Sequence, residues 1–421
     1  MRSRHEISGE NLKSGLEGHQ RPWMILFLLF ILAGGVAFLI GVSGPQAQRA
    51  WQAYLVNYVF WSGLAFGAVV FVAILNLTNA RWARPLKRLA EAPAAFLPVS
   101  FALFWVLYFG REEIFPWIHE PVKGKEAWLN VGFLFARDGA SLLLLTAVAL
   151  ILVFVSIRGD MEVLSRGRDS TFDQMGGMEK HGGIRRNWRI QMVLSPALGL
   201  LYGLVLTLIA FDLIMSLDPH WFSTLFGAYY FVGSLYTGLA ALIILTGLFR
   251  SAPGLKSLIG SKHFHDLGKI LFGFCLLTGD FFYSQFLVIW YGNLAEETRY
   301  VILRVKISPW EPLAWTVLVV SFGIPFVVLL SRKIKMKPVP LMILCGITLV
   351  GMWLERLLLV APSLWKGEQL PIGILEILIT AGFLGLMALS LTAFLRRFPL
   401  VPVSDPLFRQ TVETSRVEIS R

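Results

Sequence analysis

Ten long apolar runs constrain this chain more than any other feature. A transmembrane α-helix needs about 20 consecutive apolar residues to cross the hydrocarbon core of a bilayer, and among single segments of this length only helices can do so. The charge-free windows are 22–48, 50–80, 92–110, 139–157, 190–211, 219–249, 312–331 and 377–395. Two further apolar segments are interrupted by charges, among them Lys269 and Asp280 in 264–291 and Glu355 and Arg356 in 337–360. The sequence therefore predicts an all-α membrane protein with ten transmembrane helices.

The basic residues are distributed unevenly between the two sides of these predicted helices. Of the 38 Lys and Arg residues, 28 fall on the side that holds both chain ends and 9 on the other side, with Arg356 inside a helix. Cytoplasmic loops of membrane proteins carry the excess of Lys and Arg, so both termini are expected in the cytoplasm. The formal net charge of +11 is thus a signal of topology rather than of nucleic-acid binding.

Two similar stretches indicate an internal repeat. Residues 58–67 (YVFWSGLAFG) and 229–238 (YYFVGSLYTG) share Tyr, Phe, Leu and Gly at matched positions. The next helix of each half ends alike, in YFGREE at 108–113 and in WYGNLAEE at 290–297. Because the repeat unit has four helices, an even number, both copies face the same way about an axis along the membrane normal. We expect two four-helix bundles, from helices 2–5 and 6–9, with helices 1 and 10 at the periphery.

These boundaries divide the chain into eight segments. The long 158–190 loop is rich in Gly and charge and shows no helical periodicity. The predicted segments are a cytoplasmic N-terminal segment (1–21), helix 1 (22–48), helices 2–4 (50–157), a cytoplasmic loop (158–190), helix 5 (191–216), the second bundle (219–360), helix 10 (371–396) and a cytoplasmic tail (397–421).

The cysteines and histidines bear on redox centres. Cys275 and Cys345 are the two cysteines, and both lie inside apolar segments without a CxxC or CxxCH motif. The seven histidines all lie in loops or at helix ends, whereas a haem held between membrane helices needs histidines within them. We therefore expect no metal ligands and no iron–sulfur or haem centre in this chain.

Asp280 is the one acid expected near the middle of the membrane. Charged residues inside spanning segments are costly and are usually functional or ion-paired. Asp280, Tyr283 and Ser284 share one helix face at spacings of three and four residues. Such a group is a candidate proton relay, and the alternative is that Asp280 pairs with a cation or hydroxyl of a neighbouring helix.

The remaining candidate residues fall on the outer side of the predicted membrane. Helix directions and a rise of about 1.5 Å per residue place them there. The further candidates for a proton pathway are Asp212, Glu355, Arg356, Glu376, Asp218 and His220. A second set, predicted as an outer-side polar cluster, consists of Arg137, Asp138, Glu296, Glu297 and Arg299. Structural ion pairs and a solvated acidic face remain the alternatives for these residues.

The stretch SLDPHWFSTLFG at 216–227 combines an acid, a proline, an imidazole and an indole between two apolar runs. Asp218 before Pro219 is typical of a helix start, with Asp218 as the N-cap and Pro219 in the first turn. Trp221 is the aromatic residue expected at a membrane interface. Neither role explains His220, which with Asp212 is a candidate for proton exit.

Three motifs together resemble a known family of membrane subunits. SLDPHWFSTLFG, YYFVGSLYTG and SQFLVIWYGNLAEET at 284–298 are similar to the smaller of the two polysulfide-reductase (NrfD)-type integral membrane subunits of bacterial alternative complex III. The resemblance extends over essentially the whole membrane part, including ten helices and paired four-helix bundles.

This resemblance implies a role in a quinol:electron-acceptor oxidoreductase of the bacterial inner membrane. The partners it implies are a larger NrfD-type membrane subunit, an iron–sulfur subunit and multihaem cytochrome c subunits. The larger subunit holds the better supported site for a quinol such as menaquinone, and the smaller one helps to translocate protons. No motif in this sequence specifies a quinone-binding residue.

Two other classes of function are compatible with the sequence. A proton-coupled secondary transporter also contains parallel repeats and acids near the membrane midplane, although no matched pair of Gly/Pro-interrupted helices is visible in the two halves. A purely structural anchor for outer redox subunits would also need ten apolar helices. Copurifying polypeptides distinguish the transporter from the other two, and neutralising the intramembrane acids distinguishes the anchor.

Overall fold

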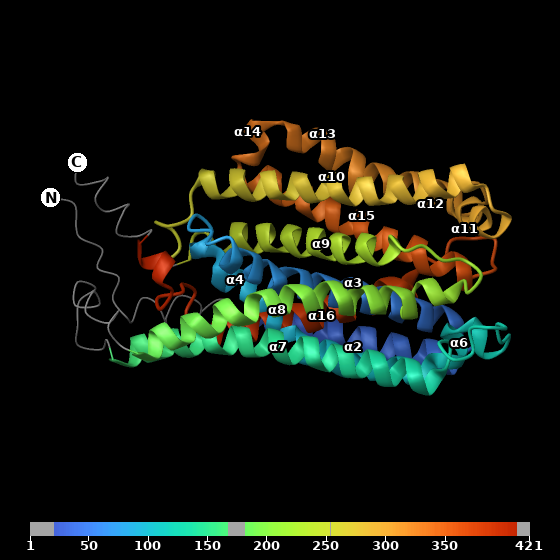
Figure 1. The fold of residues 1–421 in the computed structure, drawn as a ribbon, viewed down its shortest axis with the longest axis horizontal. Helices are drawn as coiled ribbons and strands as arrows, with labels where there is room; N and C mark the ends of the chain where they lie inside the picture. Colours follow the sequence, from blue (N-terminus) through green and yellow to red (C-terminus); the bar gives the residue numbers. More distant parts are fainter. Residues whose placement is uncertain (1–20, 167–181, 253, 411–421) are drawn as a thin grey trace.

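The protein is a bundle of ten membrane-length helices. The computed structural model describes residues 21–166, 182–252 and 254–410, and within these ranges there is no β-strand. Ten helical segments in them are long and apolar enough to cross a membrane, which confirms the predicted all-α, ten-helix, multi-pass architecture. Figure 1 shows the helices lying side by side, with α3 and α9 in the middle, α10 and α13 towards one edge and α7 along the other.

The elements follow one another in a simple order along the chain. They are α2 (Arg21–Ser43), α3 (Ala47–Leu77), η1 (Arg84–Leu86), α4 (Lys87–Glu91), η2 (Ala92–Phe96), α5 (Leu97–Val106), η3 (Leu107–Gly110), α6 (Arg111–Ile114), η4 (Pro116–Ile118), α7 (Val131–Arg166), α8 (Gly182–Leu213), η7 (Met215–Leu217), α9 (Phe226–Phe249), α10 (Ser261–Gly292), α11 (Ala295–Val305), α12 (Trp310–Val317), η8 (Leu318–Gly323), α13 (Ile324–Leu330), α14 (Arg332–Lys335), α15 (Pro338–Leu364) and α16 (Ile374–Arg397).

The two ends of the bundle differ and are named here by their elements. The α4 end carries α4 and α14, and the α6 end carries α6 and α11 (Figure 1). The charge distribution predicts that the α4 end faces the cytoplasm.

Two of the spans are interrupted by proline. The third span, Arg84–Ile114, alternates between α and 3₁₀ turns because Pro85, Pro93 and Pro98 lack the N–H that continues an α-helix. The eighth span contains a π-helical turn, η8, just before Pro325. Without an N–H on Pro325, the Ser321 carbonyl has no donor four residues later, and the Tyr236 hydroxyl donates to it at 3.3 Å.

The helices pack as the repeat predicts. In the first bundle α3, α5, α7 and α8 pack together, and in the second α9 packs against α10 and α15, with α10 against α13 and α15 against α12 and η8. Helices α2 and α16 pack against each other and against α3. They meet so closely that a Cβ on Gly34 would lie 2.6 Å from the Cα of Gly382, which is how small residues let membrane helices approach.

The two bundles join along α3 and α9, which run parallel. A Cβ on Gly67 would lie 2.1 Å from the Ser234 carbonyl oxygen, and a Cβ on Gly238 would lie 2.4 Å from the Ala68 nitrogen. Gly67 and Gly238 are matched positions of the repeat, and each touches the other helix. This reciprocal contact is what a two-fold axis along the bundle produces.

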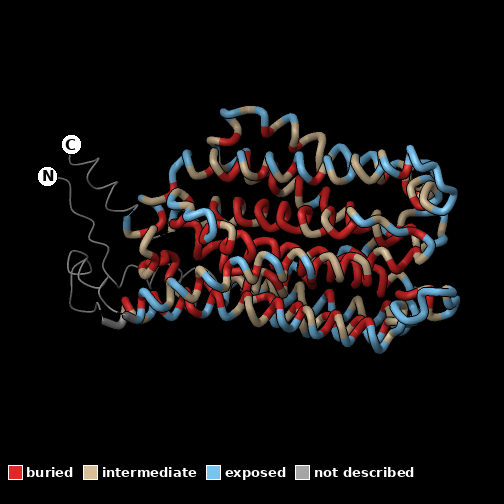
Figure 2. The backbone as a smooth tube through the Cα atoms, viewed as in Figure 1, coloured by how far each residue is buried: buried red, intermediate tan, exposed pale blue. Residues whose placement is uncertain are grey.

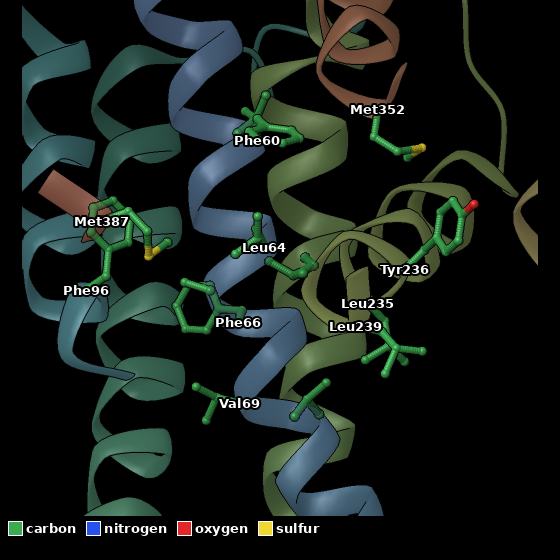
Figure 3. Packing of buried hydrophobic residues seen from close by; sticks show 14 of the residues in the cluster. Phe60, Leu64, Phe66, Val69, Phe96, Leu235, Tyr236, Leu239, Met352 and Met387 are labelled. Carbon is green, nitrogen blue, oxygen red and sulfur yellow. The ribbon is translucent and has the colours of Figure 1, made fainter. Parts of the chain in front are cut away.

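Large apolar side chains fill the rest of this interface. Figure 3 shows Leu64 of α3 beside Leu235 of α9, with Phe96 of η2 and Met387 of α16 on the opposite side of α3. All four are buried, and Figure 2 shows the buried residues concentrated along the middle of the bundle. The close α3–α9 contact therefore holds the core of the whole molecule together.

At the α4 end, the predicted 158–190 loop is partly helical, and the predicted tail from 397 is partly packed against the bundle. Helices α7 and α8 continue into the expected 158–190 loop, to Arg166 and from Gly182 respectively, and residues 167–181 lie outside the described ranges. The expected tail from 397 also folds back: its side chains Leu400, Val401 and Phe408 are buried. In both cases, distant side chains cover charges that the local sequence presents as solvated.

Candidate functional site

A buried cluster of charges occupies the α4 end. Its six members are at most 2% exposed. We call them the α4 charge cluster: Arg84, Lys87, Arg88, Glu91, Asp160 and Asp405. Three cations face three acids, so the cluster is neutral overall, as burial requires.

Each cation of this cluster has a defined partner from a distant part of the chain. Arg84 and Lys87 bind the Asp405 carboxylate at 3.0 and 2.9 Å. Arg88 forms ion pairs with both Glu91 and Asp160, the latter from α7. The sequence presents these basic residues as a loop of the cytoplasmic side, and the pairing partners could not be found from their local pattern.

Asp405 lies outside the membrane spans, and its ionisation is tied to these contacts. Burial alone raises the pKa of a carboxyl, but Lys87 and Arg84 beside Asp405 outweigh it and hold the pKa of Asp405 below its ordinary value. Asp405 also accepts backbone N–H bonds from Leu407 and Phe408. The ionised carboxylate therefore fixes residues 398–408 over the cluster.

A second buried group of charges lies towards the α6 end. The Arg137 guanidinium donates to both oxygens of Asp212 at 2.7 and 2.6 Å, and the Trp128 indole N–H donates to the same carboxylate at 2.9 Å. Arg137 also stacks over the Trp128 ring at 3.8 Å. Asp212 is therefore held rigidly by two helices and a loop.

Asp138 lies against Asp212 but has a different environment. Its side chain is 0% exposed, it lies next to the Asp212 carboxyl, and within the described part of the chain neither of its oxygens accepts a hydrogen bond. Two adjacent carboxyls with one guanidinium partner cannot both hold a negative charge at low cost. Asp138 is therefore the carboxyl of the pair that is better placed to hold a proton, because no hydrogen-bond donor among the described residues occupies its oxygens.

Polar side chains continue from Asp138 into the first bundle. The Tyr58 hydroxyl of α3 lies near Asp138 and Ser62, and Ser62 hydrogen-bonds to Ser100 at 2.6 Å. The hydroxyl of Tyr58 is buried and has no hydrogen-bond partner among the described residues. This arrangement leads from the carboxyl pair towards the middle of the bundle.

Helix α7 supplies the polar groups nearer the α4 end. Thr146 and Ser156 lie on the same buried face as Asp138 and Asp160, and Ser156 lies beside Glu91. The hydroxyl of Thr146 and one oxygen of Glu91 have no partner within the described residues. At a rise of about 1.5 Å per residue, Asp138 and Asp160 are roughly 33 Å apart along α7, about the thickness of the hydrocarbon core.

These buried side chains are spaced at intervals between the two charge clusters. We call them the polar line: Asp138, Tyr58, Ser62, Ser100, Thr146, Ser156 and Glu91. Carboxyl and hydroxyl groups both accept and donate protons, so the line has the chemistry of a proton path. Only Asp138 of these residues was singled out from the sequence. Helical spacing of polar residues along 138–160 is a sequence signal for Thr146 and Ser156, and the local sequence gives none for the other members.

The second bundle contains a separate buried ion pair. Glu355 and Arg356 of α15 are 3.0 Å apart, and the Arg356 guanidinium lies over the Tyr230 ring at 4.5 Å. Tyr229 lies beside Glu355. The pair fills the space next to Gly233, where a Cβ would lie 3.0 Å from Arg356, so it fastens α15 to α9.

The predicted relay around Asp280 is not buried within this chain. Asp280 is exposed, Tyr283 is 58% exposed and Ser284 is half-buried. Among the described residues, Asp280 forms no hydrogen bond or ion pair. Helical periodicity placed the three residues on one face, but this face of α10 is directed away from the bundle.

Glu376 has a structural explanation. It binds Arg49 through both carboxylate oxygens at 2.9 Å and accepts the Gly373 backbone N–H at 2.8 Å. It therefore caps α16 and ties it to the start of α3.

The expected helix start at Asp218 is wrong. Helix α9 begins at Phe226, and Asp218 instead follows η7 with its carboxylate 3.5 Å from Arg299. Trp221 is buried and stacks on Tyr300 at 3.7 Å, rather than lying exposed at an interface. These tertiary contacts override the local Asp–Pro signal, and His220 is left exposed.

The predicted outer-side polar cluster is divided in the structure. Arg137 and Asp138 lie with Asp212, whereas Arg299 lies with Asp218. Glu296 is exposed and Glu297 is half-buried on α11. The sequence did not identify Arg304 of α11, which is buried and donates to the Leu359 carbonyl and the Ser363 hydroxyl, both at 3.0 Å. Burial lowers the pKa of Arg304, while Tyr300 beside it acts in the opposite sense.

Neither a metal site among the described residues nor a known family identifies the function of this chain. Within residues 21–166, 182–252 and 254–410, no group of three or more His, Cys, Asp or Glu side chains is placed to hold a metal ion. No protein-family model matches the chain, and no curated protein matches it. Its function is therefore inferred from its residues and their geometry.

Proposed function

We propose that this chain is a proton-translocating membrane subunit of a quinol-oxidising electron-transfer complex. The observation that carries the proposal is the polar line, a buried series of carboxyl and hydroxyl groups between two charge clusters at opposite ends of one bundle. The quinol part of the proposal rests on the family resemblance of SLDPHWFSTLFG, YYFVGSLYTG and SQFLVIWYGNLAEET.

At the α6 end, the proposed proton carrier is Asp138. Arg137 and Trp128 donate to the oxygens of Asp212, and we assign the exchanged proton to Asp138, whose oxygens accept no hydrogen bond within the described residues. The buried Tyr58 hydroxyl, which lies near both Asp138 and Ser62, would pass a proton between Asp138 and the Ser62–Ser100 pair. Both serines are buried, which keeps this step away from lipid.

At the α4 end, the proposed carrier is Glu91. Arg88 binds one of its oxygens, and the other oxygen is unpaired among the described residues. Ser156 lies beside it on α7, and Thr146 lies between Ser156 and Asp138 on the same face. Water molecules between these hydroxyls would complete the path, as in other intramembrane proton relays.

In the complex that the resemblance implies, this path would couple quinol oxidation to proton movement across the membrane. Quinol oxidation, of menaquinol for example, would occur in the larger membrane subunit. The electrons would leave through iron–sulfur and multihaem cytochrome c subunits. With the α4 end in the cytoplasm, as the charge distribution predicts, protons would travel from Glu91 to Asp138 and leave on the outer side of a bacterial inner membrane.

The proposal is tested in the assembled complex reconstituted into vesicles. Asp138→Asn and Glu91→Gln are each expected to lower the number of protons translocated per quinol, because each removes an exchangeable carboxyl from the path. Glu296→Gln is the matched control, an exposed acid at the α6 end, and should leave this number unchanged. If both path variants assemble and translocate as many protons as the wild type, the chain is a structural anchor and not a proton path.

A further inference from the structure

The exposed face of α10 carries a carboxylate, Asp280, at a depth where lipid offers it no hydrogen bond. Residues 270–290 form an apolar stretch in which Asp280, at the central position, is the one charged residue. At about 1.5 Å per residue, this stretch spans roughly 31 Å, the thickness of the hydrocarbon core. Asp280 therefore lies near mid-depth, and its side chain is exposed on the surface of this chain.

The residues around Asp280 form a continuous stripe along the helix. Gly273, Leu277, Asp280 and Ser284 follow one another at spacings of four, three and four, which keeps them on one face. A Cβ on Gly273 would meet no atom within 4 Å. Tyr283 adds an exposed hydroxyl beside the carboxylate. We call this stripe the α10 face, and Figure 2 shows exposed residues along α10 at the edge of the bundle.

Three occupants of the α10 face can be compared by charge. Lipid tails offer no hydrogen bond to a carboxylate, which makes an exposed mid-depth acid costly. A second copy in a symmetric pair would place Asp280 against Asp280, which brings two like charges together. The segments of this chain outside the described ranges, 1–20, 167–181 and 411–421, carry several charges each, unlike the apolar run of a spanning helix.

We propose that the α10 face docks a transmembrane helix of a different subunit, and that this helix carries a basic side chain at the depth of Asp280. A cation there pairs with the carboxylate in a medium of low dielectric. The hydroxyls of Tyr283 and Ser284 supply additional hydrogen bonds between the helices. The open surface at Gly273 lets the partner backbone approach closely.

This inference refines the proposed function by naming the side of the chain that meets a partner membrane subunit. It rests on that proposal only for the existence of a complex, because the argument about Asp280 concerns the α10 face alone. The polar line lies in the other bundle, so the two proposals can fail separately. Loss of proton translocation in Asp138→Asn does not bear on docking, and loss of docking does not bear on the polar line.

The test is site-specific photo-crosslinking in native membranes. A photoreactive amino acid replaces Leu277, on the α10 face, or Leu200, which is exposed on α8, as the control. The expected result is a crosslink from position 277 to a hydrophobic peptide of a different membrane protein with Lys, Arg or His at that depth. Position 200 should yield lipid adducts instead.

The role of the carboxylate is tested in the same membranes. Asp280→Leu should lower the crosslink yield from position 277 about tenfold or more, whereas Asp280→Glu should retain most of it, because only the latter keeps the charge. Three results would overturn the proposal: a crosslink to a second copy of this chain, lipid adducts alone at position 277, or an undiminished yield in Asp280→Leu.

Discussion

The acids Asp138 and Asp280 both interrupt apolar stretches of long helices, but their structural surroundings are opposite. Asp138 lies on α7 in the first bundle and Asp280 on α10 in the second. Asp138 is buried beside Asp212 and leads into a series of hydroxyls, whereas Asp280 is exposed and unpaired within the described residues. A midplane position alone therefore does not identify a proton carrier; the polar groups packed around the acid do.

The largest expected effect concerns the α4 charge cluster. Asp405→Ala leaves Arg84 and Lys87 buried without their shared carboxylate, and removal of one partner of a buried ion pair typically costs about 3–5 kcal/mol. Unfolding of the purified protein in detergent, followed by circular dichroism against denaturant, measures this loss. Glu296→Ala, an exposed acid, is the control. A loss no larger than that of the control would show that the cluster contributes nothing to stability.

The same cluster predicts a loss of stability in acid. The folded-state pKa of Asp405 lies below its ordinary value of 3.8, so Asp405 contributes stability above its unfolded-state pKa. That contribution disappears as the pH falls through the folded-state pKa. The free energy of unfolding, measured between about pH 5 and pH 2, should fall more steeply for the wild type than for Asp405→Asn. Equal pH dependence of the two proteins would show that ionisation of Asp405 does not contribute to stability.

The two carboxyls at the α6 end should respond differently to the same change. Asp212→Asn weakens its bonds with Arg137 and Trp128, and hydrogen bonds to charged groups are worth about 1.5–3 kcal/mol. Asp138→Asn removes no hydrogen bond that its oxygens accept within the described residues, and its amide can donate to Asp212, so stability should be unchanged or slightly higher. Thermal unfolding of both variants makes the comparison. Equal losses would mean that Asp138 is also a structural anion.

The smallest effect on stability is expected at Asp280. In the isolated chain in detergent, Asp280→Leu removes no contact, so the free energy of unfolding should change by about 0.5 kcal/mol or less. The effect of this substitution should appear only in the assembled complex, as loss of the partner subunit. A large loss in the isolated chain would place Asp280 in a buried contact of its own bundle and would remove the contrast with Asp138.

The helices and the repeat could be predicted because both depend on local patterns. Ten apolar runs specify ten spans, because a segment in the hydrocarbon core must satisfy its backbone hydrogen bonds internally and so forms a helix. The matched glycines of 58–67 and 229–238 lie at the α3–α9 contact, as expected for parallel repeats. The α4 charge cluster could not be predicted, since two of its three acids, Asp160 and Asp405, come from far along the chain. Whether Arg84, Lys87 and Arg88 are solvated or buried depends on those partners.

The candidate site was predicted in part for the same reason. Depth and helical spacing identified Asp138, Asp212 and Asp280 as unusual acids, but spacing does not tell which face of a helix is directed inward. The Asp218–Pro219 pair gives a local helix-start signal, and the contact with Arg299 and the Trp221–Tyr300 stack override it. Long-range packing decided each case that the local pattern left open.

A pair of matched threonine substitutions tests the central claim most directly. Thr146 and Thr246 are both buried. The Thr146 hydroxyl, on the polar line, has no hydrogen-bond partner among the described residues, whereas the Thr246 hydroxyl donates to the Leu242 carbonyl of its own helix. Replacement by Val removes the hydroxyl and keeps the shape. The measurement is the number of protons translocated per quinol by the reconstituted complex.

Thr146→Val is expected to lower this number while assembly and quinol oxidation by the complex persist, and Thr246→Val is expected to leave it at the wild-type value. If Thr146→Val translocates as many protons as Thr246→Val, the polar line does not conduct protons and the account is contradicted.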